Sequence, residues 1–237
     1  MMIRLIIVLF LLTTSFTAVA DDSINVAYPP FEPFYTFEDG NHKGICPDTV
    51  NKIFSDESGL NFSASALPLP RIMRDLANGS LDMAGCLPCS TPDIQDSVTV
   101  STPYFSENML VIFPHQSKMH GADISDRMTM QGVTVKDAIT ERYINPDKKF
   151  LLDSWSSVIQ FIQKGRADYA VIPETIYNKV KSTEVTDNLV TTKVDSVEIC
   201  MSISNRSPLV EKIEGINLKI KLLQDADSWM KHDDSPN

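Results

Sequence analysis

The segment 78-NGSLDMAGCLPCSTPDIQDSVTVSTPYF-105 carries the signals from which the fold is predicted. Gly79 closes a run of helical spacing over residues 71–80, because glycine readily adopts the left-handed conformation that ends a helix. Residues 81–85 are a short apolar run, which is typical of a buried strand. Thr91 and Pro92 then open a second helix-like segment. Helix, strand and helix in this order predict one unit of an α/β fold.

The same alternation extends from this segment in both directions. Before it, the sequence predicts a strand from residue 24, a helix over 47–55 and a strand over 60–69. Strands that alternate with helices predict a mainly parallel sheet flanked by helices. The apolar pattern is lost over 115–129, so a crossing between two lobes is predicted there. Beyond it the pattern predicts strands at 133–136, 150–152, 166–173 and 197–204, a capped helix at 154–164 and closing helices within 208–231, after a strand at 109–114.

The first 20 residues have the form of an export signal. Arg4 precedes the unbroken apolar run at 5–12, and Ala18-Val19-Ala20 provides the small residues that signal peptidase requires. The apolar run is too short to span a bilayer, which disfavours the alternative of a membrane anchor. The sequence therefore predicts a signal peptide over residues 1–20 and a periplasmic protein that begins at Asp21.

The charge balance excludes one class of partner. The chain has 21 basic and 31 acidic residues, and Arg4 is the one charged residue of the signal peptide, so a mature chain has 20 and 31 and a net charge of −11. A nucleic-acid surface needs clustered Lys and Arg, and the sequence has no such cluster.

The cysteine and histidine spacing matches no zinc module. We therefore expect a monomer with no metal, no cofactor and no nucleic-acid partner.

Several short motifs, taken in order, resemble the family 3 extracellular solute-binding proteins, which are the periplasmic partners of polar amino-acid ABC transporters. The resemblance implies a type II periplasmic-binding-protein fold, with two α/β lobes of mixed sheets joined by two crossing strands and a ligand held in the cleft. It places the N-terminal lobe in 21–112 and 204–237 and the C-terminal lobe in 113–203. The matching residues are Pro33-Phe34 (or Pro30-Phe31), Gly40, Gly44, Asp48, Leu76, Gly79, Asp82, Thr91, Ser101, Pro103, Tyr104, the run 165-GRADYAV-171 and Trp229.

The departures from the family pattern concern the ligand. An arginine that pairs with the α-carboxylate is expected three residues after the threonine, where this chain has Ile94. The aspartate that receives the α-ammonium is replaced by Pro173. The turn 135-VKDAIT-140 lacks the glycine that exposes backbone amides to the carboxylate. The resemblance therefore implies a small polar ligand other than a standard α-amino acid held in the usual way.

The resemblance also places candidate ligand-binding residues around the cleft. Tyr28, Phe31, Phe34 and Tyr104 are expected to give an aromatic wall suited to an apolar or cationic ligand. A place in the core beneath the cleft is the alternative for Phe31 and Phe34, and it is favoured for Phe34. Arg71 is expected either to bind an anionic group of the ligand or to lie on the surface, and the two roles are weighed equally. Glu174 is expected either to accept a cationic group of the ligand or to begin a helix, where the helix dipole favours a carboxylate. The full candidate set is Tyr28, Phe31, Leu69, Arg71, Cys89, Thr91, Tyr104, Lys136 and Glu174.

The four cysteines allow three pairings in an oxidising compartment. A local disulfide between Cys86 and Cys89 is the favoured hypothesis, ahead of a Cys-x-Pro-Cys thiol-redox protein. A pairing of Cys46 with Cys86 or Cys89 is a variant, since Cys46 occupies the first aspartate position of the family's Gly-Phe-Asp-x-Asp pattern. Cys200 is expected to be a buried free thiol.

The predicted function is therefore a periplasmic solute-binding protein, not an enzyme, that closes its cleft over a small molecule. Its partner is expected to be an inner-membrane permease or a sensor. Three alternatives remain open at this point. One is a vestigial binding protein or scaffold, one is a dehydratase-like enzyme on the same fold with Glu174 and Lys136 as acid and base, and one is the thiol-redox protein.

Overall fold

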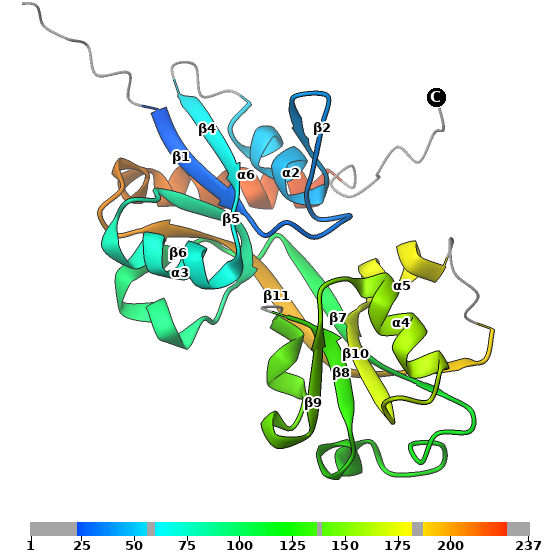
Figure 1. Ribbon diagram of the computed structural model, residues 1–237. Helices are drawn as coiled ribbons and strands as arrows, with labels where there is room; N and C mark the ends of the chain where they lie inside the picture. The colour runs from blue at the N-terminus through cyan, green and yellow to red at the C-terminus, as the bar shows by residue number, and fades with distance from the viewer. Residues whose placement is uncertain (1–22, 56–59, 137–138, 182–186, 227–237) are drawn as a thin grey trace, which may run out of the picture.

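A computed structural model describes residues 23–55, 60–136, 139–181 and 187–226. Within these residues the chain forms two α/β lobes that two long strands connect (Figure 1). The predicted signal peptide and Trp229 lie outside the described residues. No helix in the described part of the chain combines the length and the apolar character needed to cross a bilayer.

The N-terminal lobe is built on three parallel strands. β1 (Ser23–Tyr28) lies between β4 (Asn61–Ala66) and β5 (Met83–Pro88). The alternation predicted on both sides of Gly79 is confirmed, because α2 (Ile45–Ile53) and α3 (Leu69–Asn78) separate these strands in the chain. The lobe is completed by the hairpin β2 (Thr36–Glu38) and β3 (Asn41–Lys43), η1 (Pro92–Ser97), β6 (Val98–Val100), η5 (Pro208–Lys212) and α6 (Ile213–Asp225).

The C-terminal lobe repeats the parallel arrangement on a smaller scale. β8 (Gly132–Val135) pairs in parallel with β9 (Lys149–Leu152) and with β10 (Tyr169–Pro173). α4 (Trp155–Gln163) connects β9 to β10, and its apolar face is buried as its spacing predicts. The remaining elements are α5 (Glu174–Lys181) and the short helices η2 (Ile124–Thr129), η3 (Ile139–Tyr143) and η4 (Pro146–Lys148).

Two antiparallel strands form the connection between the lobes. β7 (Phe105–Pro114) and β11 (Leu189–Ser204) pair from Leu189 opposite Pro114 to Ile199 opposite Phe105. β11 continues into the N-terminal lobe, where it pairs with β5 and β6. The crossing predicted at 115–129 is therefore placed too late, because the chain has already crossed along β7 when it reaches the turns of that segment. The predicted lobe boundaries fall within β7 and at the end of β11, and they stay a prediction.

Local signals in the sequence account for where several helices begin and end. Gly79 has a φ of 80° and donates its N–H to the Leu76 carbonyl, which closes α3. The Ser154 side chain accepts from the N–H of Ser157 and caps α4. Ser207 accepts from Leu209 in the same way, ahead of Pro208 in the first turn. The boundaries at Gly79 and Ser154 confirm the predictions made from these residues, and Pro208 begins the first of the predicted closing helices.

The disulfide bonds correct the cysteine predictions. Cys46 of α2 is bonded to Cys86 of β5, and Cys89 is bonded to Cys200 of β11. The favoured Cys86–Cys89 bond is wrong, the variant pairing of Cys46 with Cys86 is confirmed, and Cys200 is not a free thiol. Cys86 lies on the strand and meets the start of α2, whereas Cys89 has passed the strand end and meets β11. A Cys-x-Pro-Cys redox pair is therefore absent, because the two sulfurs belong to different bonds.

Gly85 of β5 marks a close approach in the core of the N-terminal lobe. A Cβ added there would lie 2.7 Å from Cδ1 of Tyr28, whose ring is buried and stacked on Tyr35. The Gly85 carbonyl also accepts from the hydroxyl of Tyr104. An alanine would thus displace a ring that has no free space to move into.

We expect Gly85→Ala to lower the free energy of unfolding by about 2 kcal/mol, because overpacked cores are strained by amounts of this order. Urea denaturation measures this value. Gly121→Ala is a glycine control with open space around it, although its positive φ gives a strain of its own. An equal or smaller loss in Gly85→Ala than in this control would contradict the account.

Candidate functional site

A cleft of about 80 Å³ lies between the two lobes. The ends of β1 and β5 line it on one side, α4 and β10 line it on the other, and the connecting strands form its floor. Its walls are almost entirely apolar. The lining residues are Pro29, Phe31, Phe34, Leu69, Cys86, Leu87, Pro88, Phe105, Glu107, Met109, Ile139, Thr140, Trp155, Pro173, Ile176 and Ile199.

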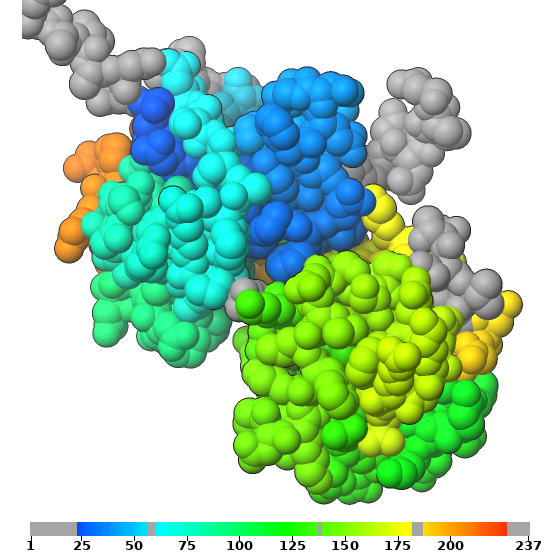
Figure 2. All heavy atoms as spheres, viewed as in Figure 1, coloured from blue at the N-terminus to red at the C-terminus, as the bar shows by residue number. Residues whose placement is uncertain are grey.

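The loop after β1 brings aromatic rings from the N-terminal lobe to the C-terminal lobe. The ring of Phe31 meets Trp155 of α4 edge to face, with centroids 6.2 Å apart. Phe34 stacks on Phe105 of β7 at 6.1 Å, so it packs on the cleft wall as well as against the core. Figure 2 shows the blue N-terminal loop in contact with the yellow-green surface of the other lobe. These rings close the cleft on one side.

One ion pair also joins the lobes beside these rings. The Nζ of Lys179 in α5 lies 2.6 Å from Oε2 of Glu32 in the same loop. Both side chains are about half exposed, so the pair contributes little to stability.

Trp155 carries an unpaired donor in the cleft wall. The residue is 9% exposed, and its indole Nε1 has no hydrogen-bond partner among the described residues. The Ser154 cap fixes its backbone, since Trp155 is the first residue of α4. Burying a polar group without a partner costs about 1 to 3 kcal/mol. A hydrogen bond from a ligand acceptor to this N–H would therefore contribute more binding free energy than one to a donor that is exposed to water.

Glu107 is the one ionisable side chain among the lining residues. It is buried on β7, and its two carboxylate oxygens accept from the N–H and the hydroxyl of Thr175 at 2.9 and 2.7 Å. The N–H belongs to the first turn of α5, so Glu107 ties β7 to that helix. Burial raises the pKa of Glu107 above its ordinary value, and the bonds from Thr175 oppose part of this rise.

The raised pKa predicts a pH dependence that Glu107→Gln removes. Because the folded protein holds this proton at a pH where the unfolded chain has released it, the contribution of Glu107 is greatest below about pH 4.5 and falls as the pH rises through the folded pKa. We therefore expect the stability of Glu107→Gln relative to the native protein to increase over that interval. Urea denaturation at a series of pH values measures the difference. A difference that is constant with pH, or that decreases, would show that the carboxylate is stabilised in its charged form.

Two of the predicted aromatic residues lie beneath the cleft. Tyr28 is 2% exposed and stacks on Tyr35, and Tyr104 is 1% exposed and donates to the Gly85 carbonyl. Burial raises the pKa of the Tyr104 phenol well above its ordinary value, which keeps it neutral. Of the predicted set, Phe31 and Leu69 line the cleft itself. Tyr28 and Tyr104 instead pack against Gly85 of β5, the strand whose end lines one side of the cleft.

Cys89 and Thr91 line a different hollow, on the N-terminal lobe beside β6. The Thr91 hydroxyl donates to the Pro88 carbonyl at 3.0 Å, and Cys89 is occupied by its bond to Cys200. The sequence pattern thus brings these two residues together but separates them from Phe31 and Leu69.

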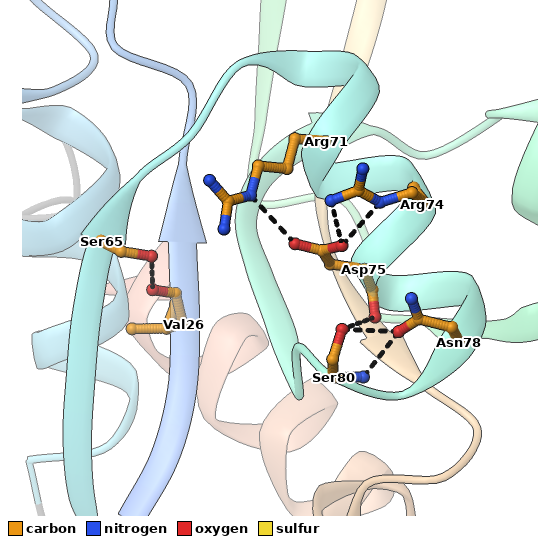
Figure 3. Close-up of polar contacts among 7 residues, drawn as sticks. All are labelled: Val26, Ser65, Arg71, Arg74, Asp75, Asn78 and Ser80. Atoms are coloured by element: carbon orange, nitrogen blue, oxygen red, sulfur yellow. Dashed lines mark hydrogen bonds and ion pairs between the residues drawn. The ribbon is translucent and has the colours of Figure 1, made fainter.

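Arg71 lies on the exposed face of α3. Its Nε lies 3.3 Å from Oδ2 of Asp75 one turn later, and Arg74 binds the same carboxylate (Figure 3). The Arg71 side chain is 58% exposed. This arrangement agrees with the surface alternative for Arg71, and contact with a ligand stays a prediction.

Lys136 and Glu174 are not joined in the described part of the chain. Lys136 is exposed directly after β8, and its backbone N–H donates to the Leu152 carbonyl. Glu174 opens α5, where Oε2 accepts from the Asn108 amide at 2.6 Å. The acid–base pair of the enzyme hypothesis therefore has no support from the contacts of these two residues. Nor do three or more His, Cys, Asp or Glu side chains gather as metal ligands within the described ranges.

The positions at which the sequence departs from the family pattern have separate structural roles. Ile94 is 4% exposed and packs with Ile72, Leu76 and other residues of the N-terminal core. Pro173 lies at the end of β10 and lines the cleft. No lysine or arginine is among the lining residues. An α-carboxylate would find no basic partner in this cleft.

Sequence reasoning missed Glu107 and Trp155. Glu107 stands two residues before the apolar run 109–114, and that run gave no sign that the strand begins at Phe105. Trp155 was assigned to the buried face of its helix by its spacing, and the spacing does not show that its ring also reaches the cleft. The signal that points to Glu107 is its place two residues after Phe105 and two before Met109, which puts it on the same face of a strand as these two apolar residues.

Comparisons with known proteins agree with this architecture. The GluR0 ligand-binding core in complex with L-glutamate superposes with a TM-score of 0.73 at 17% identity over 87% of this chain and 94% of that one. A mutant of ArgBP from T. maritima superposes with a TM-score of 0.69 at 16% identity, over 87% of this chain and 91% of that one. A histidine kinase sensor domain with similarity to periplasmic binding proteins superposes with a TM-score of 0.72 at 13% identity, over 88% of this chain and 92% of that one. At these identities the likeness shows the fold alone. No curated protein matches the sequence.

The sequence itself matches one family model. Residues 23–164, which are more than half of the chain, match the model of the bacterial extracellular solute-binding proteins, family 3. The matched region runs from β1 through α4 and includes most of the residues that line the cleft. The fold, the cleft between two lobes and this match together show that the chain belongs to the family 3 bacterial extracellular solute-binding proteins.

Proposed function

We propose that the protein binds a small molecule with a mainly apolar body in the cleft between its lobes and delivers it to a permease or a sensor in the inner membrane. It acts in the periplasm as a monomer and performs no catalysis. The observation that carries this proposal is the composition of the cleft, in which thirteen of the sixteen lining residues are Pro, Phe, Leu, Met, Ile or Trp.

The absence of basic lining residues separates this cleft from one that holds an α-amino acid. A buried carboxylate without a cationic partner is strongly disfavoured. The lining carboxylate, Glu107, already accepts two hydrogen bonds from Thr175, and burial raises its pKa, so it is a weaker partner for an α-ammonium group than an unpaired, ionised carboxylate would be. The family resemblance implies a small polar ligand. The composition of the cleft supports a ligand whose polar part is small relative to its apolar body.

The same contacts support binding without chemistry. Glu107 and Thr140 are the lining residues that carry acid–base or hydroxyl groups, and each already has a partner within its own lobe. The Thr140 hydroxyl lies 2.5 Å from that of Thr134. The other lining residues carry no acid, base or nucleophile that could act together with either of them.

A thermal-shift screen tests the proposal. A compound that binds the native state alone raises the unfolding midpoint by mass action. We expect uncharged aromatic and aliphatic compounds to raise it, and α-amino acids with the same side chains to leave it unchanged. Larger shifts with α-amino acids would contradict the proposed ligand class. If no compound of any class changes the unfolding midpoint, the result would favour a scaffold that has lost its ligand.

A further inference from the structure

We infer that the ligand is an uncharged molecule that carries a hydrogen-bond acceptor on an aromatic or branched aliphatic body, and that this acceptor binds the indole N–H of Trp155. The inference rests on the proposed function and names the ligand's polar group. It starts from one observation, which is that a buried donor in the cleft wall lacks a partner among the described residues.

The position of Trp155 makes it a suitable anchor. It belongs to the C-terminal lobe, its ring meets Phe31 of the N-terminal lobe, and the capped start of α4 holds its backbone. A ligand bound next to the Trp155 ring therefore touches both lobes. A tryptophan offers a large apolar surface and one donor, and that donor normally has a partner when it is buried.

The surroundings of Trp155 determine the charge of the acceptor. No lysine or arginine is among the described residues that line the cleft, so a carboxylate would be buried with a single neutral donor from this part of the chain. A carbonyl, ether or hydroxyl oxygen accepts the same hydrogen bond without bringing a charge into the apolar site. Glu107 would further repel an anion when it is ionised. The site thus favours a neutral acceptor over a charged one.

The indole N–H signal in NMR spectra gives a direct test. The chain has two tryptophans, Trp155 and Trp229, so protein labelled at the tryptophan nitrogen shows two indole signals, and Trp155→Phe assigns them. The probes are acetophenone, ethylbenzene and L-phenylalanine, which share a phenyl ring and differ in polar groups. We expect acetophenone to move the Trp155 proton signal downfield while the Trp229 signal stays in place. Ethylbenzene should cause no downfield shift.

Affinities provide a second, independent readout. Trp155→Phe keeps an aromatic ring, although a smaller one, and removes the donor, so we expect it to weaken the binding of acetophenone about fivefold and to leave that of ethylbenzene within about twofold. The thermal midpoint of the variant, measured without probe, shows whether it is folded. If the variant does not fold, Trp229→Phe assigns the two indole signals instead, so the NMR test on the native protein still stands.

The outcomes separate this inference from the proposed function. Equal binding of acetophenone and ethylbenzene, with no downfield shift, would overturn the inference and leave an apolar binding cleft. Binding of L-phenylalanine alone would overturn both. A Trp155 signal that already lies downfield in the free protein and that no probe moves would show that the donor has an internal partner. A cleft that takes up none of the probes up to their solubility would also overturn the inference, while the wider thermal-shift screen judges the proposed function.

Discussion

Replacing Cys89 and Cys200 together by serine is expected to lower the free energy of unfolding by about 4 kcal/mol, and the unfolding midpoint by roughly 10 °C. The bond between them closes a loop with a sequence separation of 111 residues, and the main effect of a crosslink is to restrict the unfolded chain. It also ties the end of β5 to β11, one of the two strands that connect the lobes. Urea denaturation of both proteins under oxidising conditions measures the loss.

The second disulfide provides a matched control. Cys46 and Cys86 are separated by 40 residues, and the two loops do not overlap in the chain. Replacing this pair by serine should therefore cost about 1 kcal/mol less than replacing the first pair. A loss below about 1 kcal/mol for the Cys89–Cys200 pair would contradict the assigned connectivity. Peptide mapping of the unreduced protein gives the connectivity independently.

Replacing Phe31 by alanine is expected to weaken ligand binding by about 10- to 100-fold, because burial of a phenylalanine side chain contributes about 1.5 to 3 kcal/mol. Phe31 lines the cleft and supplies the aromatic contact with Trp155 across the lobes. The variant loses both a wall of the pocket and part of the closure contact. A fluorescence titration with the strongest uncharged compound from the thermal-shift screen measures the change.

Phe37 offers a control of the same residue type. It lies on β2 with 60% of its surface exposed and does not line the cleft. Phe37→Ala should leave the affinity within about twofold, since a solvent-exposed ring loses little burial. Equal effects of the two substitutions would place the binding site outside the cleft between the lobes.

Much of the fold follows from local signals in the sequence. Apolar runs with strand or helix spacing predicted the main elements of both lobes, and Gly79, Ser154 and Ser207-Pro208 mark helix boundaries by their own conformational preferences. The lobe crossing was placed too late. The strands β7 and β11 alternate buried and exposed residues where they leave the lobes, so the apolar run shows only the buried part of β7.

The disulfide bonds and the residues that line the cleft depend on strand pairing between distant parts of the chain, so they could not be predicted from local sequence. A Cys-x-Pro-Cys spacing makes a local bond look available, but β5 carries Cys86 toward α2, and the chain beyond the strand carries Cys89 toward β11. Which side chains face the cleft depends on the same register. Leu69 and Phe31 line it, and their contact with a ligand stays a prediction, while Tyr28 and Tyr104 are buried in the N-terminal lobe.

The central claim is that the two lobes enclose a solute with an apolar body, and the heat-capacity change of binding tests it most directly. Calorimetric titration of the strongest uncharged compound at several temperatures gives this quantity, because burial of apolar surface makes the heat-capacity change negative. We predict a clearly negative value for an uncharged compound and no measurable binding of the α-amino acid with the same side chain. A heat-capacity change near zero, together with tighter binding of the α-amino acid, would contradict the account.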